Sequence, residues 1–239
     1  MPSKLTRITL VSAILTLSSL ASQANEGVIS SIETRSQQLT DLSDLIWDLA
    51  EVGYQETRSS EALKSALSAE GFSIESGVAD IPTAFVASYG SGEPVIAVMG
   101  EFDALPGISQ AAVPFEQKIE GKNAAQACGH HLFGAASTTA AVALARWLAE
   151  EEISAKITLV GTPAEEGGSG KVYLVRAGIF DDVDIVLHWH PGDVNSASPS
   201  TSTANKSGRF TFTGRAAHAA LAPDRGRSAL DGVEAMNFM

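Results

Sequence analysis

Apolar residues along the 239-residue chain follow two different spacings, which predict helices and strands in alternation. In residues 30–51 and 59–70 they recur at helical spacing and a glycine follows each segment, so both segments are predicted as helices. The short apolar segments AFVASYG and PVIAVMG are predicted as strands. The second is almost wholly apolar, as expected of a strand that is covered on both faces.

The alternation continues after a loop rich in Gly, Pro and Gln at residues 101–126. Residues 132–151 predict a long Ala-rich helix, KITLVGTP a buried strand, GKVYLVRAGIF a helix and DIVLHWH another strand. Strands that alternate with helices indicate an α/β fold in which a sheet lies between layers of helices.

The pattern changes at the polar segment NSASPSTSTANKS. Beyond it, GRFTFTG alternates like a half-exposed strand, and residues 227–239 predict an apolar helix that continues to the last residue. A helix that stops inside an apolar run lacks partners for its buried face. We therefore expect the chain to be the N-terminal part of a longer protein.

The first residues have the layout of a secretory signal peptide. Lys4 and Arg7 precede the apolar run ITLVSAILTLSSL, and the small residues Ser22 and Ala24 then form a cleavage site after Ala24. The run is too short for a comfortable membrane span, although a retained N-terminal anchor is the alternative. Export to the periplasm or the medium is predicted, with no membrane attachment after cleavage.

Composition narrows the choice of partners. The chain is 44% hydrophobic and 18% charged, which is typical of a globular protein rather than a disordered one. The formal net charge of −12 repels phosphate and anionic lipid, which excludes nucleic acid and membrane surfaces and favours a small molecule or a protein. Cys128 is the only cysteine, so it cannot form a disulfide within the chain, and burial or a metal is the expected reason for it.

The five histidines fall in three short segments, one of which lies beside Cys128. Taken singly, each histidine fits an ordinary core or surface position. Cys128 and His130, however, stand two apart at the predicted start of a helix, which favours a thiolate. Thiolate and imidazole together suit a divalent metal such as zinc. The remaining histidines are His131, His188, His190 and His218.

Two adjacent acids, Glu165 and Glu166, follow the predicted strand KITLVGTP. On an ordinary surface loop they would be solvated charges. At the carboxyl end of a strand, one of them can bind a metal while the other faces a water, which supplies a hydrolase with its general base. His188 and His190 share one face of the last predicted strand; His190 is expected to reach the site, and His188 to pack or support it.

Four motifs occur in a fixed order: ACGHHLFG, GTPAEEGGSG, DVDIVLHWHPGD and GRAAHAALAPDRGRSALD. Together they resemble the M20 metallopeptidase family, in its amidohydrolase branch with a cysteine ligand, from about residue 41 to the last residue. The resemblance implies a zinc-exopeptidase-like α/β fold, with a mixed, mostly parallel sheet and helices on both faces. Residues 25–200 would be the N-terminal part of a catalytic metal-binding domain, and 201–239 the beginning of an α+β lid and dimerisation domain.

The resemblance also implies a function and the residues that perform it. The implied reaction is cleavage of an amide between an acyl or aroyl group and an amino acid, at a two-metal site for zinc or manganese, in a homodimer or heterodimer. Glu165 is the implied general base, Asp103 of GEFDALP supports the metal site, and His218 reaches the partner subunit's active site to stabilise the tetrahedral intermediate. The implied metal ligands, whose ligand atoms should lie within about 5 Å of a common position, are Cys128, His130, Glu166 and His190.

Two departures from the family pattern leave alternatives open. His131 stands where this branch usually has Asp or Asn, and the family's last histidine ligand is not in this chain. One alternative is therefore a catalytically inactive fragment that keeps metal or partner binding. The other makes Cys128 a nucleophile with a histidine base. Its neighbour His130 is badly placed for that pairing, and the adjacent glutamates would have no role.

Overall fold

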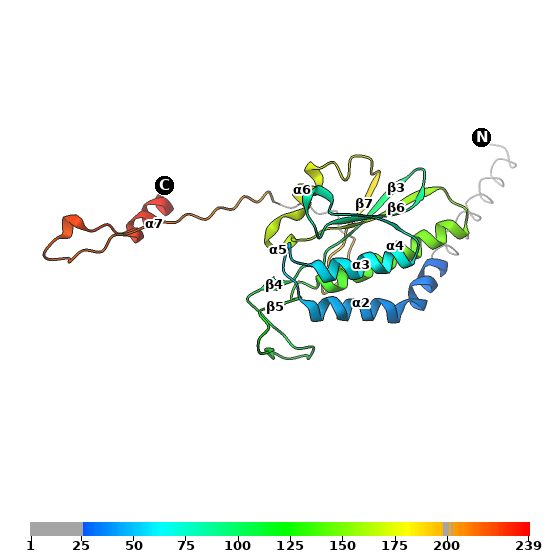
Figure 1. Cartoon of the computed structure of the whole chain (residues 1–239), viewed down its shortest axis with the longest axis horizontal. Coiled ribbons are helices and arrows are strands. Elements are labelled where there is room, and N and C mark those ends of the chain that lie inside the picture. The colour runs from blue at the N-terminus through cyan, green and yellow to red at the C-terminus, as the bar shows by residue number, and fades with distance from the viewer. Residues whose placement is uncertain (1–25, 198–200, 202) are drawn as a thin grey trace, which may run out of the picture. The chain divides into compact units, whose positions relative to one another are not determined.

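The computed structural model describes residues 26–197, 201 and 203–239, which fall into two compact units (Figure 1). The first unit ends at Asp193, and the second is Val194–Met239. The predicted signal peptide lies outside the described residues. The predicted domain border, between residues 200 and 201, falls a few residues after the border between the units.

Three helices of the first unit lie on one face of its sheet: α2 (Ser36–Leu49), α3 (Thr57–Ala69) and α4 (His130–Glu150) (Figure 1). The sequence predicts all three, but residues 26–34 form a separate helix because the backbone of Arg35 leaves the helical conformation. By length and composition α4 could cross a membrane. Because 61% of its apolar window is buried within the unit, it is instead the central helix of the core.

The described residues of the first unit contain seven strands. They are β1 (Ser73–Ser76), β2 (Phe85–Ser91), β3 (Val95–Gly100), β4 (Leu105–Pro106), β5 (Ala124–Ala125), β6 (Ala155–Gly161) and β7 (Ile185–Leu187). Five of them form a mixed sheet in the order β1-β2-β6-β3-β7, in which β6, β3 and β7 are parallel, and β2 pairs antiparallel with both β1 and β6. The predicted loop 101–126 contains a separate antiparallel pair, β4 with β5.

Helices cover both faces of this sheet because its strands direct apolar side chains into two cores. In β6, Ile157 and Leu159 pack with α2, α3 and α4, whereas Val160 packs in the opposite core. That second core is closed by α6 (Gly170–Arg176) and the 3-10 turn Val78–Asp80. The predicted α/β class, with a mixed sheet and helices on both faces, is confirmed (Figure 1).

Two predicted strands differ from the structure. β7 ends at Leu187, so His188 and His190 follow the strand rather than belonging to it. GRFTFTG forms no strand in the described part of the second unit, where an isolated bridge joins Arg215 to Arg227 instead. An alternating pattern becomes a strand only where a neighbouring strand accepts its backbone hydrogen bonds.

The predicted C-terminal helix is present in the second unit as α7 (Ala229–Phe238). It begins two residues later than the pattern predicts, because Ser228 caps it by accepting a hydrogen bond from the backbone N–H of Asp231. A 3-10 turn, Pro223–Arg225, precedes it.

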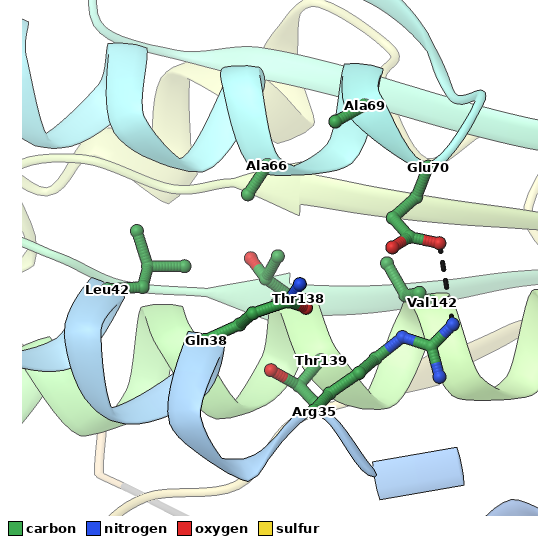
Figure 2. Close-up of a pocket in the computed structure, with 9 residues that line it drawn as sticks. All are labelled: Arg35, Gln38, Leu42, Ala66, Ala69, Glu70, Thr138, Thr139 and Val142. Carbon is green, nitrogen blue, oxygen red and sulfur yellow. Dashed lines mark ion pairs between the residues drawn. The ribbon is translucent and has the colours of Figure 1, made fainter.

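A cavity of about 250 Å³ lies between α2, α3 and α4 and shares no residue with the predicted site (Figure 2). Its walls are largely apolar, and Arg35 forms an ion pair with Glu70 beside it, at 3.5 Å. Thr138 also lines this cavity. Its hydroxyl is buried and has no hydrogen-bond partner in the part of the chain that the structure describes.

Replacing Thr138 with Val is expected to stabilise the protein. Valine keeps the shape of threonine and removes a hydroxyl whose burial costs free energy, so the free energy of unfolding should rise by about 1 kcal/mol. Urea denaturation measures this change. Thr139→Val is the matched control, because the Thr139 hydroxyl donates to Ala135 O at 3.0 Å and its loss should not stabilise. Equal destabilisation by both substitutions would mean that the Thr138 hydroxyl is hydrogen-bonded in solution.

Candidate metal centre and active site

Side chains from four segments meet at the carboxyl ends of the parallel strands. Glu101 and Asp103 follow β3, the short helix α5 (Glu165–Gly168) follows β6, and the histidine segment follows β7. Cys128 and His130 lie at the start of α4. In open α/β sheets, ligands bind at this edge of the sheet.

Cys128, His130 and His190 offer ligand atoms that all lie within 4.8 Å of one another. Sγ of Cys128 is 3.4 Å from Nε2 of His190, and the rings of His130 and His190 stand edge to face at 5.5 Å. His130 is completely buried, Cys128 is partly buried and His190 is exposed. The structure therefore brings together three of the four predicted metal ligands.

A second group overlaps the first at His130. Its other members are Glu101 and Glu165, again with ligand atoms within 4.8 Å of one another. Nε2 of His130 lies 2.9 Å from Oε2 of Glu101, without the alignment of a hydrogen bond. Glu101 is buried and forms an ion pair with Lys171, and its other carboxylate oxygen, Oε1, lies 3.4 Å from Nε2 of His188.

Glu101 is a site residue that the sequence reasoning missed. The available signal was an acid placed directly after an apolar strand, two positions before Asp103 in GEFDALP. His188 contacts Glu101, at 3.4 Å between Nε2 and Oε1, and its supporting role stays a prediction.

Asp103 holds two parts of the site in place. Its Oδ1 accepts a hydrogen bond from Nδ1 of His130 at 2.9 Å, and its Oδ2 accepts one from the backbone N–H of Glu166, also at 2.9 Å. The bond to Nδ1 orients the imidazole and leaves Nε2 directed at the group of ligand atoms. Asp103 thus lies where the sequence reasoning expected a supporting residue.

The two adjacent glutamates differ in exposure and in the groups that they contact. Glu165 is exposed and belongs to the group with His130 and Glu101. Glu166 belongs to neither group of the described residues, but its carboxylate is close enough to hydrogen-bond the thiol of Cys128. Its Oε1 is buried and has no partner that meets the geometry of a hydrogen bond.

Burial and acidic neighbours set the charges of these groups. Burial lowers the pKa of His130, but the hydrogen bond to Asp103 and the negative charge of Glu101 outweigh it and raise the pKa to about 10. Burial raises the pKa of Glu101, but His130 and Lys171 outweigh it and lower the pKa to about 2. Burial, followed by the negative charges of Glu166 and Glu165, raises the pKa of the Cys128 thiol to about 11.

The raised pKa of Cys128 corrects one expectation. The start of a helix was predicted to favour the thiolate, but three acids lie close enough to favour the neutral thiol. A thiol in this surrounding is a poor nucleophile at neutral pH, which argues against a thiol hydrolase. A bound cation would favour the thiolate over the thiol, because it neutralises the negative charge of the acids and binds the thiolate directly.

The residues of this site fit a divalent cation. Thiolate, imidazole and carboxylate are the ligands that zinc takes in proteins. Three buried polar atoms here make no aligned hydrogen bond among the residues that the structure describes: Oε2 of Glu101 and Nε2 of His130, which form an ion pair at 2.9 Å, and Oε1 of Glu166. Buried polar atoms without aligned hydrogen bonds cost free energy, and a cation held between them would lower that cost.

Metal binding is expected to release protons and to weaken as the pH falls. At pH 7 the metal-free site holds a proton on Nε2 of His130 and another on Cys128, because both pKa values are raised. Both protons must leave before these atoms can bind a metal, so affinity should rise with pH toward the raised pKa values. Calorimetric titration with zinc in buffers of different ionisation enthalpy should give about two protons per ion. Zinc binding with no proton release would contradict these charge states.

Two further histidines belong to neither group of the described residues. His131 packs edge to face on Trp47 at 4.9 Å, and its backbone N–H donates to the side-chain oxygen of Gln126. His218 lies in the second unit, where its Nδ1 accepts hydrogen bonds from the backbone N–H groups of Ala220 and Leu221. Its expected action at a partner's site stays a prediction.

Comparison with known proteins matches residues 97–222 to the family description "Peptidase family M20/M25/M40". The chain is 45% identical over 207 residues to one of the subunits of p-aminobenzoyl-glutamate hydrolase from Escherichia coli (strain K12), covering 86% of this chain and 43% of that protein. It is 32% identical over 214 residues to Xaa-Arg dipeptidase of Mus musculus, covering 84% of this chain and 45% of that protein. The chain thus spans less than half the length of these relatives.

Solved structures agree on the fold. The chain resembles an aminobenzoyl-glutamate utilization protein from Klebsiella pneumoniae with a TM-score of 0.58 and 18% identity, over 87% of this chain and 58% of that one. It resembles a putative aminohydrolase from methicillin-resistant Staphylococcus aureus with a TM-score of 0.59 and 22% identity, over 68% of this chain and 41% of that one.

Proposed function

The chain belongs to peptidase family M20/M25/M40, and we propose that its protein is a metal-dependent amidohydrolase that cleaves the amide between an acyl or aroyl group and an amino acid. One observation carries this proposal. Cys128, His130 and His190 converge at the sheet edge, and the carboxylate of Glu165 lies beside the same buried imidazole.

Glu165 is the group that moves the proton. It is exposed at the edge of the site, so a water and a substrate amide can reach it, and its carboxylate belongs to the same group as Nε2 of His130. As general base it takes a proton from the attacking water, and as general acid it returns that proton to the leaving amine.

Cys128, His130 and His190 are the proposed metal ligands, and Glu166, beside Cys128, completes the set. A divalent metal bound there supplies a Lewis acid for the amide carbonyl and for water. The thiolate and imidazole ligands favour zinc over manganese, since manganese prefers oxygen. We propose that a second ion is held at Glu101 in the overlapping group, and that Glu165 acts there as the base rather than as a ligand.

The substrate, location and assembly are also proposed. The relative from Escherichia coli is named for p-aminobenzoyl-glutamate, an aroyl amino acid, and we propose a substrate of the same class for this protein. The pattern of residues 1–24 supports export to the periplasm. The segment GRAAHAAL supports a dimer in which His218 contributes to the active site of the partner molecule.

Hydrolysis of p-aminobenzoyl-glutamate by the purified protein tests this proposal. Release of glutamate should stop after removal of metal with a chelator and return when zinc or manganese is added. Turnover that survives complete metal removal would overturn the metal-dependent mechanism. A protein that binds zinc and hydrolyses no acyl or aroyl amino acid would instead support the alternative of an inactive metal-binding chain.

A further inference from the structure

The segment between α2 and α3 contacts the turn that carries the two glutamates of the site. Glu56, the last residue before α3, is 0% exposed, and both of its carboxylate oxygens are hydrogen-bonded. Oε1 accepts from the backbone N–H of Ala164 at 2.8 Å, and Oε2 accepts from the hydroxyl of Thr83 at 3.0 Å. A buried carboxylate is costly, so these two bonds are what keeps it in place.

Ala164 has an unusual backbone conformation directly before Glu165. Its φ of 57° and ψ of 43° are left-handed, a region that residues with a side chain adopt at a cost in free energy. Ala164 is also completely buried. Such a conformation persists only where the surroundings hold it, and such positions cluster at active sites.

Three side chains hold this turn at three different points. Glu56 binds the N–H of Ala164, Asp103 binds the N–H of Glu166, and the hydroxyl of Tyr54 donates to the carbonyl of Gly168 at 2.6 Å. Of the three, Glu56 is the one bonded to the left-handed residue itself. Asp103 and Tyr54 bind residues that follow Ala164 in the chain.

We infer that Glu56 is a positioning residue for the glutamate pair. Its carboxylate holds Ala164 in the left-handed conformation, which directs Glu165 toward His130 and Glu101 and brings Glu166 beside Cys128. The roles of Glu165 and Glu166 rest on the proposed function. The hold on Ala164 rests only on the hydrogen bond and the backbone conformation.

Substitutions at Glu56 and Thr83 separate positioning from ordinary core stability. Glu56→Gln keeps an oxygen for Ala164 and offers an amide to the Thr83 hydroxyl, so it should behave like the wild type. Glu56→Asp keeps the charge, but its side chain is one methylene shorter, so its oxygen no longer reaches the N–H of Ala164. Glu56→Met has no oxygen to accept that hydrogen bond. Thr83→Val breaks the bond to the other oxygen, Oε2, and leaves the bond to Ala164 intact.

The test measures zinc affinity by calorimetry, and amide hydrogen exchange of residues 164–166, for these four variants. Glu56→Asp and Glu56→Met should lower zinc affinity by about 10–100-fold, the usual cost of losing a group that supports ligands. They should also accelerate exchange of the Ala164 amide, whereas Glu56→Gln and Thr83→Val should stay close to the wild type in both. If Glu56→Met does not fold, Glu56→Asp decides.

Wild-type exchange at Ala164 in Glu56→Asp would overturn the inference, as would equal losses in Glu56→Asp and Thr83→Val. If the wild-type protein binds no zinc, the proposed function fails, and the exchange of the Ala164 amide still decides whether Glu56 holds the turn.

Discussion

Replacing Glu165 with Gln is expected to lower the rate of amide hydrolysis by about 10²–10⁴-fold and to leave the metal bound. Glutamine keeps the shape of the side chain and cannot take a proton from water. The carboxylate is exposed beside His130, and the three ligand atoms of Cys128, His130 and His190 do not depend on it. Initial rates on an aroyl amino acid, together with the metal content of the purified variant, measure both parts.

Glu166→Gln is the matched comparison, because the same chemical change is made one residue away. Glu166 lies beside Cys128 and has a buried oxygen without a partner, so its substitution should weaken metal binding before it affects proton transfer. Equal metal loss in both variants would mean that the two roles are misassigned. Full activity of Glu165→Gln would end the general-base assignment.

Replacing Cys128 with Ala is expected to lower zinc affinity strongly. Loss of a group that only supports a ligand usually costs about 10–100-fold in affinity, and loss of Cys128 should cost more. The reason is that the thiolate would be a direct ligand and is the only sulfur in its group. Competition with a chromogenic chelator measures the affinity. Cys128→Ser should lie between wild type and Cys128→Ala, because a hydroxyl is a weaker ligand for zinc than a thiolate.

Circular dichroism and urea denaturation provide the control for this substitution. Because Cys128 lies at the edge of the fold and outside both hydrophobic cores, Cys128→Ala should keep the secondary structure of the metal-free protein. Zinc affinity equal to that of the wild type in a folded Cys128→Ala variant would remove the cysteine from the metal centre.

The helices and the buried strands of the first unit could be predicted because their patterns match what the fold buries. In α3, Leu63 and Leu67 are four apart and both are completely buried. β1 was missed because its sequence, SIES, is polar. It is held in the sheet by its backbone pairing with β2 rather than by burial of its side chains. GRFTFTG failed for the opposite reason, since its alternating pattern has no pairing strand in the described residues.

The site could be predicted only as far as local spacing reaches. Cys128 and His130 are two apart at a helix start, so their proximity is a local property. Glu101 was missed because its importance comes from His130 and Lys171, which are 29 and 70 residues away in the sequence. The left-handed conformation of Ala164, directly before the two glutamates, could not be predicted either, because alanine rarely adopts it.

X-ray absorption spectroscopy at the zinc edge, on the zinc-loaded protein, tests the central claim most directly, because it reports the atoms bound to the metal. The account predicts one sulfur at about 2.3 Å together with nitrogen or oxygen ligands at about 2.0–2.1 Å. The sulfur should disappear in Cys128→Ala, since Cys128 is the only cysteine. A spectrum with nitrogen and oxygen ligands alone in the wild-type protein would contradict a metal centre built on Cys128, His130 and His190.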